Sequence, residues 1–255
     1  EVLSAAIAAA YLNIPVAHIE GGDVTGTIDE SVRHAITKFA HIHFATNEVA
    51  HTRLLRMGEN PKFIFNVGAP EIEFIARNRG KLKICDETVN YLGVGSVIDM
   101  DKPYIVVMYH PVTTEYGSNR GHTETLLGAI HELDMPAIWF WPNVDAGADE
   151  VSKAIRSFRE KRKFDKIRFI KYLPPEEFHG LILSSRCLIG NSSAGIKECS
   201  YLGVPVVNIG TRQNGRARGK NVIDVDYRKE DIARAVKTQV AHGKYICDTI
   251  YYKSG

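Results

Sequence analysis

The chain has few cysteines and no long uninterrupted apolar run. Its four cysteines are scattered without any CxxC pair: Cys85, Cys187, Cys199 and Cys247. This spacing gives little support to a disulfide framework or a cysteine-based zinc site, and it suits a reducing, cytoplasmic compartment. The longest apolar window, residues 3–19, is rich in alanine and is interrupted by Asn13 and Pro15. It therefore predicts no membrane span, and no basic stretch precedes it as a secretory signal would require.

Blocks of positive charge are also missing. The 32 lysines and arginines are interspersed with 30 aspartates and glutamates, for a formal net charge of +2. A protein that follows a phosphate backbone carries a basic surface, so nucleic acid is not predicted as a partner. With 44% hydrophobic and 24% charged residues, the chain has an ordinary globular composition and enough length for one or two cores. It opens on Glu1 without a methionine and enters a helical pattern at once, so we expect upstream residues to be absent.

Short apolar runs alternate with longer segments of helical period, which is typical of parallel βαβ units. The runs are nearly continuous in apolar residues, as strands covered on both faces require. The expected strands lie at 15–20, 41–46, 62–70, 103–111, 137–143, 166–173, 186–193, 205–210 and 221–227. The expected helices lie at 1–12, 29–40, 47–58, 123–134, 149–163, 175–185, 195–203 and 229–243.

A polar, glycine-bearing segment at 76–102 separates the two series and is the candidate connection between domains. The pattern thus predicts an α/β protein with two Rossmann-like parallel-sheet domains, a partial first domain over 1–98 and a second over 99–255. No repeat of solenoid period and no low-complexity tract is present.

Polar groups follow four of the expected strands, in HIEGG at 18–22, YHPVTTE at 109–115, WPNVDAG at 141–147 and GNSSAG at 190–195. In an open parallel sheet, ligands bind beyond the carboxyl ends of the strands, so these segments are candidates for one site. Each has a plainer interpretation as a solvated loop acid, a loop histidine or a helix cap. Their recurrence at the same edge favours the functional interpretation.

GNSSAGIKE at 190–198 comes between a strand and a helix, which is the arrangement of an anion site formed by serine hydroxyls and helix-start N–H groups. It lacks the GK[ST] of a P-loop and the GxGxxG of a dinucleotide fold, so neither ATP hydrolysis nor NAD binding is indicated. Glu198 would accept from ribose hydroxyls or be a surface acid. The loop GTRQNGRARG carries Arg212, Arg216 and Arg218, which suggests a diphosphate, although solvated arginines on a turn are equally common.

Five blocks together resemble the hydrolysing UDP-N-acetylglucosamine 2-epimerases. They are HIEGGDVTGTIDESVRHAITKFAH at 18–41, HPVTTE at 110–115, FWPNVDAG at 140–147, IGNSSAGIKE at 189–198 and NIGTRQNGR at 208–216. The resemblance implies a fold similar to the GT-B glycosyltransferases, with UDP held by the second domain. The positions that match the family's UDP-binding residues are His110, Asn143, Ser192, Ser193, Glu198 and Arg212.

Glu20 and Asp29 match the family's catalytic carboxylates, and His110 is expected to assist the chemistry. Glu30 is more in keeping with a helix start, where negative charge is favoured. The family also has a GDR stretch directly ahead of the first helix, which supplies a third catalytic acid and a nucleotide-binding arginine, and a final helix that would follow Gly255. If the molecule ends where this sequence ends, we expect weak UDP binding and poor turnover.

The resemblance implies elimination of UDP to a 2-acetamidoglucal, followed by hydration to free N-acetylmannosamine, with no metal or other cofactor. Two carboxylates on one loop suit removal and return of a proton, and their individual roles stay open. EGGD at 20–23 and YHPVTTE at 109–115 depart from the non-hydrolysing epimerases, which favours release of the free sugar.

Three alternatives remain: a UDP-2,4-diacetamido-2,4,6-trideoxyglucose 2-epimerase, a glycosyltransferase on the same architecture, and a non-catalytic nucleotide-sugar sensor. The expected helices at 1–12 and 30–40 carry more apolar surface than one sheet face needs, which marks either a dimer contact or core. The resemblance implies a homodimer or homotetramer.

Overall fold

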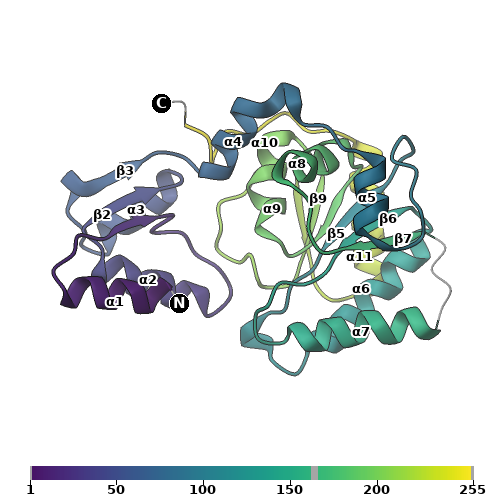
Figure 1. Cartoon of the computed structure of the whole chain (residues 1–255), viewed down its shortest axis with the longest axis horizontal. Helices are drawn as coiled ribbons and strands as arrows, with labels where there is room; N and C mark the ends of the chain where they lie inside the picture. Colours follow the sequence, from purple (N-terminus) through teal and green to yellow (C-terminus); the bar gives the residue numbers. More distant parts are fainter. Residues whose placement is uncertain (1, 162–165, 254–255) are drawn as a thin grey trace.

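A computed structural model describes residues 2–161 and 166–253. Within them the chain forms two sheets, a three-stranded one and a seven-stranded one, each covered by helices (Figure 1). The α/β class and the parallel sheets predicted from the sequence are confirmed. No helix within these residues has the length and apolar character to cross a membrane.

The smaller lobe is built on the parallel sheet β1-β2-β3. Its strands are β1 (Ala17–Ile19), β2 (Ile42–Ala45) and β3 (Ile64–Asn66), and its helices are α1 (Val2–Tyr11), α2 (Asp29–Phe39) and α3 (Glu48–Arg56). A short 3-10 helix, η1 (Pro61–Phe63), precedes β3. Helix α3 begins where the Asn47 side chain accepts from the Ala50 N–H at 2.9 Å, which satisfies one of the free donors at a helix start.

The larger lobe is built on the sheet β10-β9-β8-β5-β6-β7-β4. Its strands are β4 (Val94–Gly95), β5 (Ile105–Met108), β6 (Ala137–Phe140), β7 (Ile167–Ile170), β8 (Leu188–Gly190), β9 (Val206–Ile209) and β10 (Val222–Val225). All pair in parallel except β4, which is antiparallel to β7. Strands β5 to β9 are buried along their whole length, which explains their continuous apolar sequences.

Helices cover both faces of this sheet (Figure 1). One face packs against α6 (Asn119–Leu133), α7 (Ala148–Lys161) and α11 (Lys229–His242). The other packs against α8 (Pro175–Ser184), α9 (Ser193–Ile196) and α10 (Glu198–Leu202). Helix α6 begins four residues before its expected start, because the Asn119 amide closes the preceding turn by accepting from the Val112 N–H at 2.8 Å. The last two residues of the helix expected at 149–163 lie outside the described residues.

The segment expected to connect two domains belongs to the larger lobe. It contains the end of α4 (Pro70–Asn78), η2 (Arg79–Lys81), α5 (Asp86–Leu92) and β4. Ile72, Ile75 and Val89 are buried in the same core as Val106 of β5. The division at residues 98 and 99 stays a prediction, and this shared core favours a boundary before Pro70.

The helix expected at 195–203 is interrupted. Helix α9 ends and α10 begins at Lys197, whose φ of −94° and ψ of −69° depart from helical values. The last described residues return towards the smaller lobe (Figure 1). There the Tyr251 carbonyl accepts from the Ala69 N–H at 2.8 Å, and the Tyr251 hydroxyl donates to the Ala217 carbonyl at 2.6 Å.

Candidate active site

The loop after β1, residues 20–28, contacts the larger lobe. The Gly26 N–H donates to the Arg212 carbonyl at 3.0 Å, and the Gly26 carbonyl accepts from the Thr114 hydroxyl at 3.0 Å. The Ile28 N–H donates to the Thr113 hydroxyl at 3.3 Å. A Cβ at position 26 would lie 2.0 Å from the Thr211 carbonyl oxygen, so only glycine permits this approach. The carboxylate-bearing loop is thereby placed against two segments that follow strands of the other sheet.

Glu20 occupies a strained position at the start of this loop. Its φ is +64°, which is rare for a residue with a side chain, and its N–H donates to the Phe44 carbonyl at 2.9 Å. Its Oε1 lies 2.8 Å from the Nζ of Lys197. Burial by itself raises the pKa of Glu20, but the Lys197 ammonium, with help from Arg216 and Arg33, outweighs burial and lowers it. Glu20 is therefore ionised at neutral pH.

Lys197 is 3% exposed, and its ammonium has carboxylates on several sides. Besides Glu20 it meets Glu71 of α4 at 2.9 Å and Asp23 of the loop at 4.0 Å. Burial would lower the pKa of Lys197, but Glu20 and Glu71 outweigh this and raise it above its ordinary value. Sequence reasoning missed Lys197, Glu71 and Asp23, because nothing local distinguishes this lysine from a surface residue of an amphipathic helix.

In the loop that follows β9, Arg216 and Arg218 are held by protein groups and are not solvated arginines on a turn. Arg216 is buried, its Nε donates to the Val24 carbonyl at 3.0 Å, and its Nη2 lies 3.5 Å from Asp23. Arg218 pairs with Asp224. Both guanidinium groups thus have protein partners, and within the described residues Arg212 is the member of the trio that retains a buried donor, its Nε, without one.

Asp29 and Glu30 open α2. The Asp29 Oδ2 accepts from the Thr27 hydroxyl at 3.2 Å, and its charge acts on both Arg212 and Arg33. The Glu30 Oε2 accepts from the Thr25 N–H at 3.0 Å, so Glu30 ties the loop to the helix start, in keeping with the structural role expected for it. Asp29 and Glu20 are thus held at opposite ends of one loop by different partners.

His110, Asn143 and Asn191 come together at the carboxyl ends of neighbouring strands β5, β6 and β8. The His110 N–H donates to the Asn191 Oδ1 at 2.8 Å, and the His110 carbonyl accepts from the Asn191 Nδ2 at 2.8 Å. The His110 Nδ1 accepts from the Asn143 N–H at 3.2 Å, so the ring proton is on Nε2. Burial, with Arg212 contributing, lowers the pKa of His110 to about 3, which makes it a neutral donor.

Asn191 is also the neighbour of Ser192, Ser193 and Arg212. The Ser192 hydroxyl caps α9 by accepting from the Ala194 N–H at 3.3 Å, and Ser193 is the first residue of that helix. The Arg212 Nη1 donates to the Asn191 carbonyl at 3.2 Å, and its Nη2 lies 3.7 Å from Asp145. The structure thus gathers His110, Asn143 and Arg212 into one group, of which the strand-end argument predicted His110 and Asn143.

Glu198 opens α10 and is partly buried, with the charges of Glu71, Lys197 and Glu20 acting on it. Burial raises its pKa to about 7, and the Glu71 carboxylate adds to the rise. Its Oε2 has no hydrogen-bond partner, and the same holds for the Asn143 Oδ1 and the Arg212 Nε. Unpaired buried polar atoms are costly and uncommon. Those of Asn143 and Arg212 lie close together, since both side chains contact Asp145, which favours a ligand that supplies complementary donors and acceptors.

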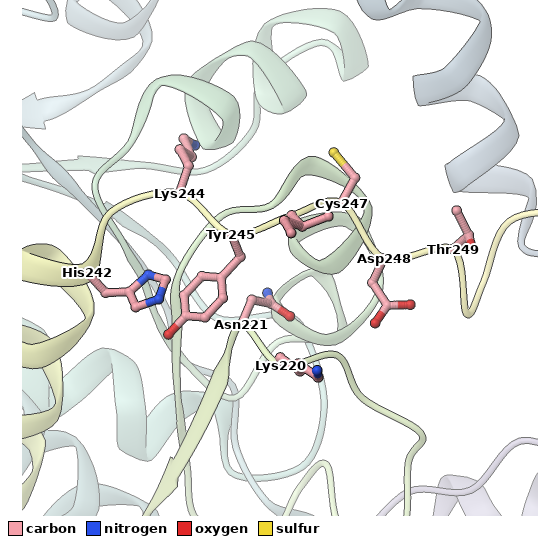
Figure 2. Close-up of a pocket in the computed structure, with 9 residues that line it drawn as sticks. Lys220, Asn221, His242, Lys244, Tyr245, Cys247, Asp248 and Thr249 are labelled. Atoms are coloured by element: carbon pink, nitrogen blue, oxygen red, sulfur yellow. The ribbon is translucent and has the colours of Figure 1, made fainter.

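A separate cavity of about 480 Å³ lies beneath the segment that follows α11 (Figure 2). Lys220, Asn221, Lys244 and Asp248 line it, and the His242 and Tyr245 rings stack at its rim with centroids 3.9 Å apart. None of the site residues expected from the sequence lines this cavity.

The family described as UDP-N-acetylglucosamine 2-epimerase matches residues 1–251. The chain belongs to this family. It is 38% identical over 237 residues to the "UDP-N,N'-diacetylbacillosamine 2-epimerase (hydrolyzing)" of Legionella pneumophila, covering 93% of this chain and 60% of that protein. It is 34% identical over 253 residues to the UDP-N-acetylglucosamine 2-epimerase of Neisseria meningitidis, covering 98% of this chain and 64% of the relative. The chain thus spans about 60% of the length of these relatives, and the resemblance stated from the sequence is confirmed.

Solved structures agree on the fold. The UDP-N-acetylglucosamine 2-epimerase of Methanocaldococcus jannaschii, crystallised with UDP-GlcNAc and UDP, superposes with a TM-score of 0.76 at 20% identity, over 99% of this chain and 69% of that one. The Neisseria meningitidis enzyme bound to UDP-GlcNAc gives the same TM-score, over 98% and 69% of the two chains. The fold of this chain is therefore GT-B-like.

Proposed function

We propose that this epimerase-family protein is a hydrolysing UDP-sugar 2-epimerase, which converts UDP-N-acetylglucosamine and water into N-acetylmannosamine and UDP. One observation carries the proposal. A loop that carries two carboxylates, Glu20 and Asp29, is hydrogen-bonded to the larger lobe. In that lobe, buried polar atoms of Asn143, Glu198 and Arg212 have no hydrogen-bond partner in the protein. Family membership and the named activities of the relatives support it.

The chemistry follows from the charges. Glu20, held ionised by Lys197, removes the proton from carbon 2 of the sugar. The electrons of that C–H bond form the C1–C2 double bond as the C1–O bond breaks and UDP departs. Water then adds across the double bond: its hydroxyl joins carbon 1, and its proton reaches carbon 2 on the opposite face through Asp29. The proton held by Glu20 passes to the solvent, which restores the carboxylate. Each positioned proton transfer is typically worth about 10²–10⁴-fold in rate.

The nucleotide is held by the larger lobe in this proposal. The Nε2–H of His110 and the guanidinium of Arg212 face the charge that develops on the departing diphosphate, and the Ser192–Ser193 turn supplies further donors. Glu198 accepts from ribose hydroxyls through its unpaired oxygen. No residue of this set requires a metal. Homodimer or homotetramer assembly and a cytoplasmic location stay predictions.

A second candidate substrate is UDP-2,4-diacetamido-2,4,6-trideoxyglucose. It is favoured by the 38% identity to a relative named as a UDP-N,N'-diacetylbacillosamine 2-epimerase. A glycosyltransferase would need an acceptor other than water, and a sensor would bind UDP and tolerate loss of Glu20. Product formation in water alone separates the epimerase from both.

The test is a proton NMR time course of the full-length gene product with UDP-N-acetylglucosamine in deuterated water. We expect free N-acetylmannosamine and UDP, with deuterium at carbon 2. Turnover of the diacetamido sugar alone would select the second candidate, and inertness towards both would contradict the enzymatic proposal. Glu20→Gln and Asp29→Asn should each lower kcat while UDP affinity stays nearly unchanged, and loss of nucleotide binding in these variants would refute the division of labour.

A further inference from the structure

Lys197 is a buried cation between two helices and two lobes. It ends α9 and begins α10, and this break in the helix comes directly before Glu198. Lys197 contacts the carboxylate loop of the smaller lobe, and the charges of Glu71 and Glu20 act on the next residue, Glu198.

Three carboxylates and one further cation surround Lys197. Its Nζ lies 2.8 Å from Glu20, 2.9 Å from Glu71 and 4.0 Å from Asp23, and it stands 5.7 Å from the centre of the Tyr251 ring. Asp23 has a second cation, Arg216, at 3.5 Å. Glu71 comes from α4, whereas Glu20 and Asp23 come from the loop after β1. The ammonium therefore joins the loop to the core of the larger lobe.

We propose that Lys197 is a positioning residue, which holds the Glu20 carboxylate at the junction of the two lobes for the proton transfer described above. This inference rests on the proposed function. The ion pairs of Lys197 contribute little net folding stability, because taking an ammonium and its carboxylates out of water costs about as much as their attraction returns. The pairing instead specifies geometry, since removing either partner leaves an uncompensated buried charge.

Holding Glu20 also suits the proposed step. Its left-handed backbone is strained, and the Lys197 contact restricts the side chain that this backbone presents. When Glu20 accepts the proton from carbon 2, the cluster loses one negative charge while the departing diphosphate gains one nearby. Lys197 and Arg216 then balance the two remaining carboxylates, Glu71 and Asp23. The charge of Glu20 no longer opposes the negative charge on the diphosphate, which favours the products of the elimination.

The test compares Lys197→Met, which keeps length and removes charge, with Lys197→Arg, which keeps charge. Lys153→Met is the matched control, because Lys153 is a surface lysine paired with Asp149 one helical turn away. We expect Lys197→Met to lower kcat roughly tenfold or more while UDP affinity changes less than about threefold, and Lys197→Arg to recover most of the loss. A loss confined to UDP affinity, or equal losses in all three variants, would overturn the proposal.

A pH profile gives a readout that a merely structural role would not move. The charged and titratable groups that act on Glu20 or share its cluster are Lys197, Arg216, Arg33, His18, Glu198, Glu71 and Asp23. Loss of the ammonium raises the pKa of Glu20, so the acid limb of kcat/KM should move to higher pH in Lys197→Met and stay in place in Lys153→Met. An unmoved limb in Lys197→Met would refute the assignment.

Two further measurements keep the proposal testable whatever the first variants do. In a Glu20→Gln/Lys197→Met double variant, the loss of kcat should not exceed that of Glu20→Gln alone, since the lysine acts through this carboxylate. Additive losses would contradict the proposal.

If the wild-type protein turns over neither UDP-sugar, the proposed function fails. The ¹³C NMR titration of the Glu20 carboxyl in wild type and Glu71→Gln, which retains the lysine, still decides whether Glu20 is held ionised by Lys197.

Discussion

Glu198→Gln should stabilise the protein at neutral and alkaline pH while weakening nucleotide binding. Glu198 is partly buried, and burial raises its pKa from 4.5 to about 7. A tenfold change in an equilibrium constant is about 1.4 kcal/mol, so keeping this carboxylate ionised in the folded protein costs about 3 kcal/mol. Glutamine has nearly the same shape and no charge to bury, and the unpaired Oε2 shows that no hydrogen bond to that oxygen is lost.

The sign of the pH dependence follows from linkage. Below pH 4.5 the carboxyl is protonated in both the folded and the unfolded chain, so the substitution changes nothing. Between pH 4.5 and 7 the unfolded chain gives up its proton first, and folding stability falls as pH rises. Above pH 7 the full penalty applies, and the glutamine variant escapes it.

Urea denaturation of wild type and Glu198→Gln at pH 5 and pH 8 measures this directly. We expect a difference in the free energy of unfolding of less than about 1 kcal/mol at pH 5 and about 3 kcal/mol in favour of the variant at pH 8. UDP affinity, compared between the same two proteins so that titration of the phosphate cancels, should fall in the variant. Equal stability at both pH values would refute the argument that Glu198 is held in the site at the expense of folding.

Three other substitutions test individual contacts. Ser193→Ala should raise KM several-fold with little change in kcat, measured by initial rates of UDP release. His110→Ala should lower kcat on the order of 10²-fold without moving either limb of the pH profile, since the imidazole is neutral throughout; a displaced limb would show that it ionises. Gly26→Ala places a Cβ 2.0 Å from the Thr211 carbonyl and should reduce activity roughly tenfold or more, whereas Gly80→Ala, with nothing within 4 Å, should not.

Much of the larger lobe could be predicted from sequence because its signals are local. Strands such as Ile105–Met108 and Val206–Ile209 are continuous apolar runs, and a strand buried on both faces requires this pattern. The strand-end argument also placed His110 and Asn143 together, because adjacent parallel strands deliver their carboxyl ends to one edge.

Segments without a strong period were harder to predict. Residues 76–102 look like a connection because they are polar and contain glycine, yet Val89 and Ile98 anchor them in the core of the larger sheet. Burial of these few side chains depends on contacts with residues of the sheet that are distant in sequence, so the local sequence does not predict it.

The composition and the order of motifs determined the α/β class, the family and the candidate carboxylates of this protein. Tertiary structure alone decided which charges meet: Lys197 with Glu20, which are 177 positions apart in sequence, and Arg216 with Asp23. An ion pair between lobes leaves no period and no spacing in the chain, because its two members belong to separate elements. Their ionisation was likewise decided by the fold, since burial and neighbouring charge, rather than residue type, raise the pKa of Glu198 and lower that of Glu20.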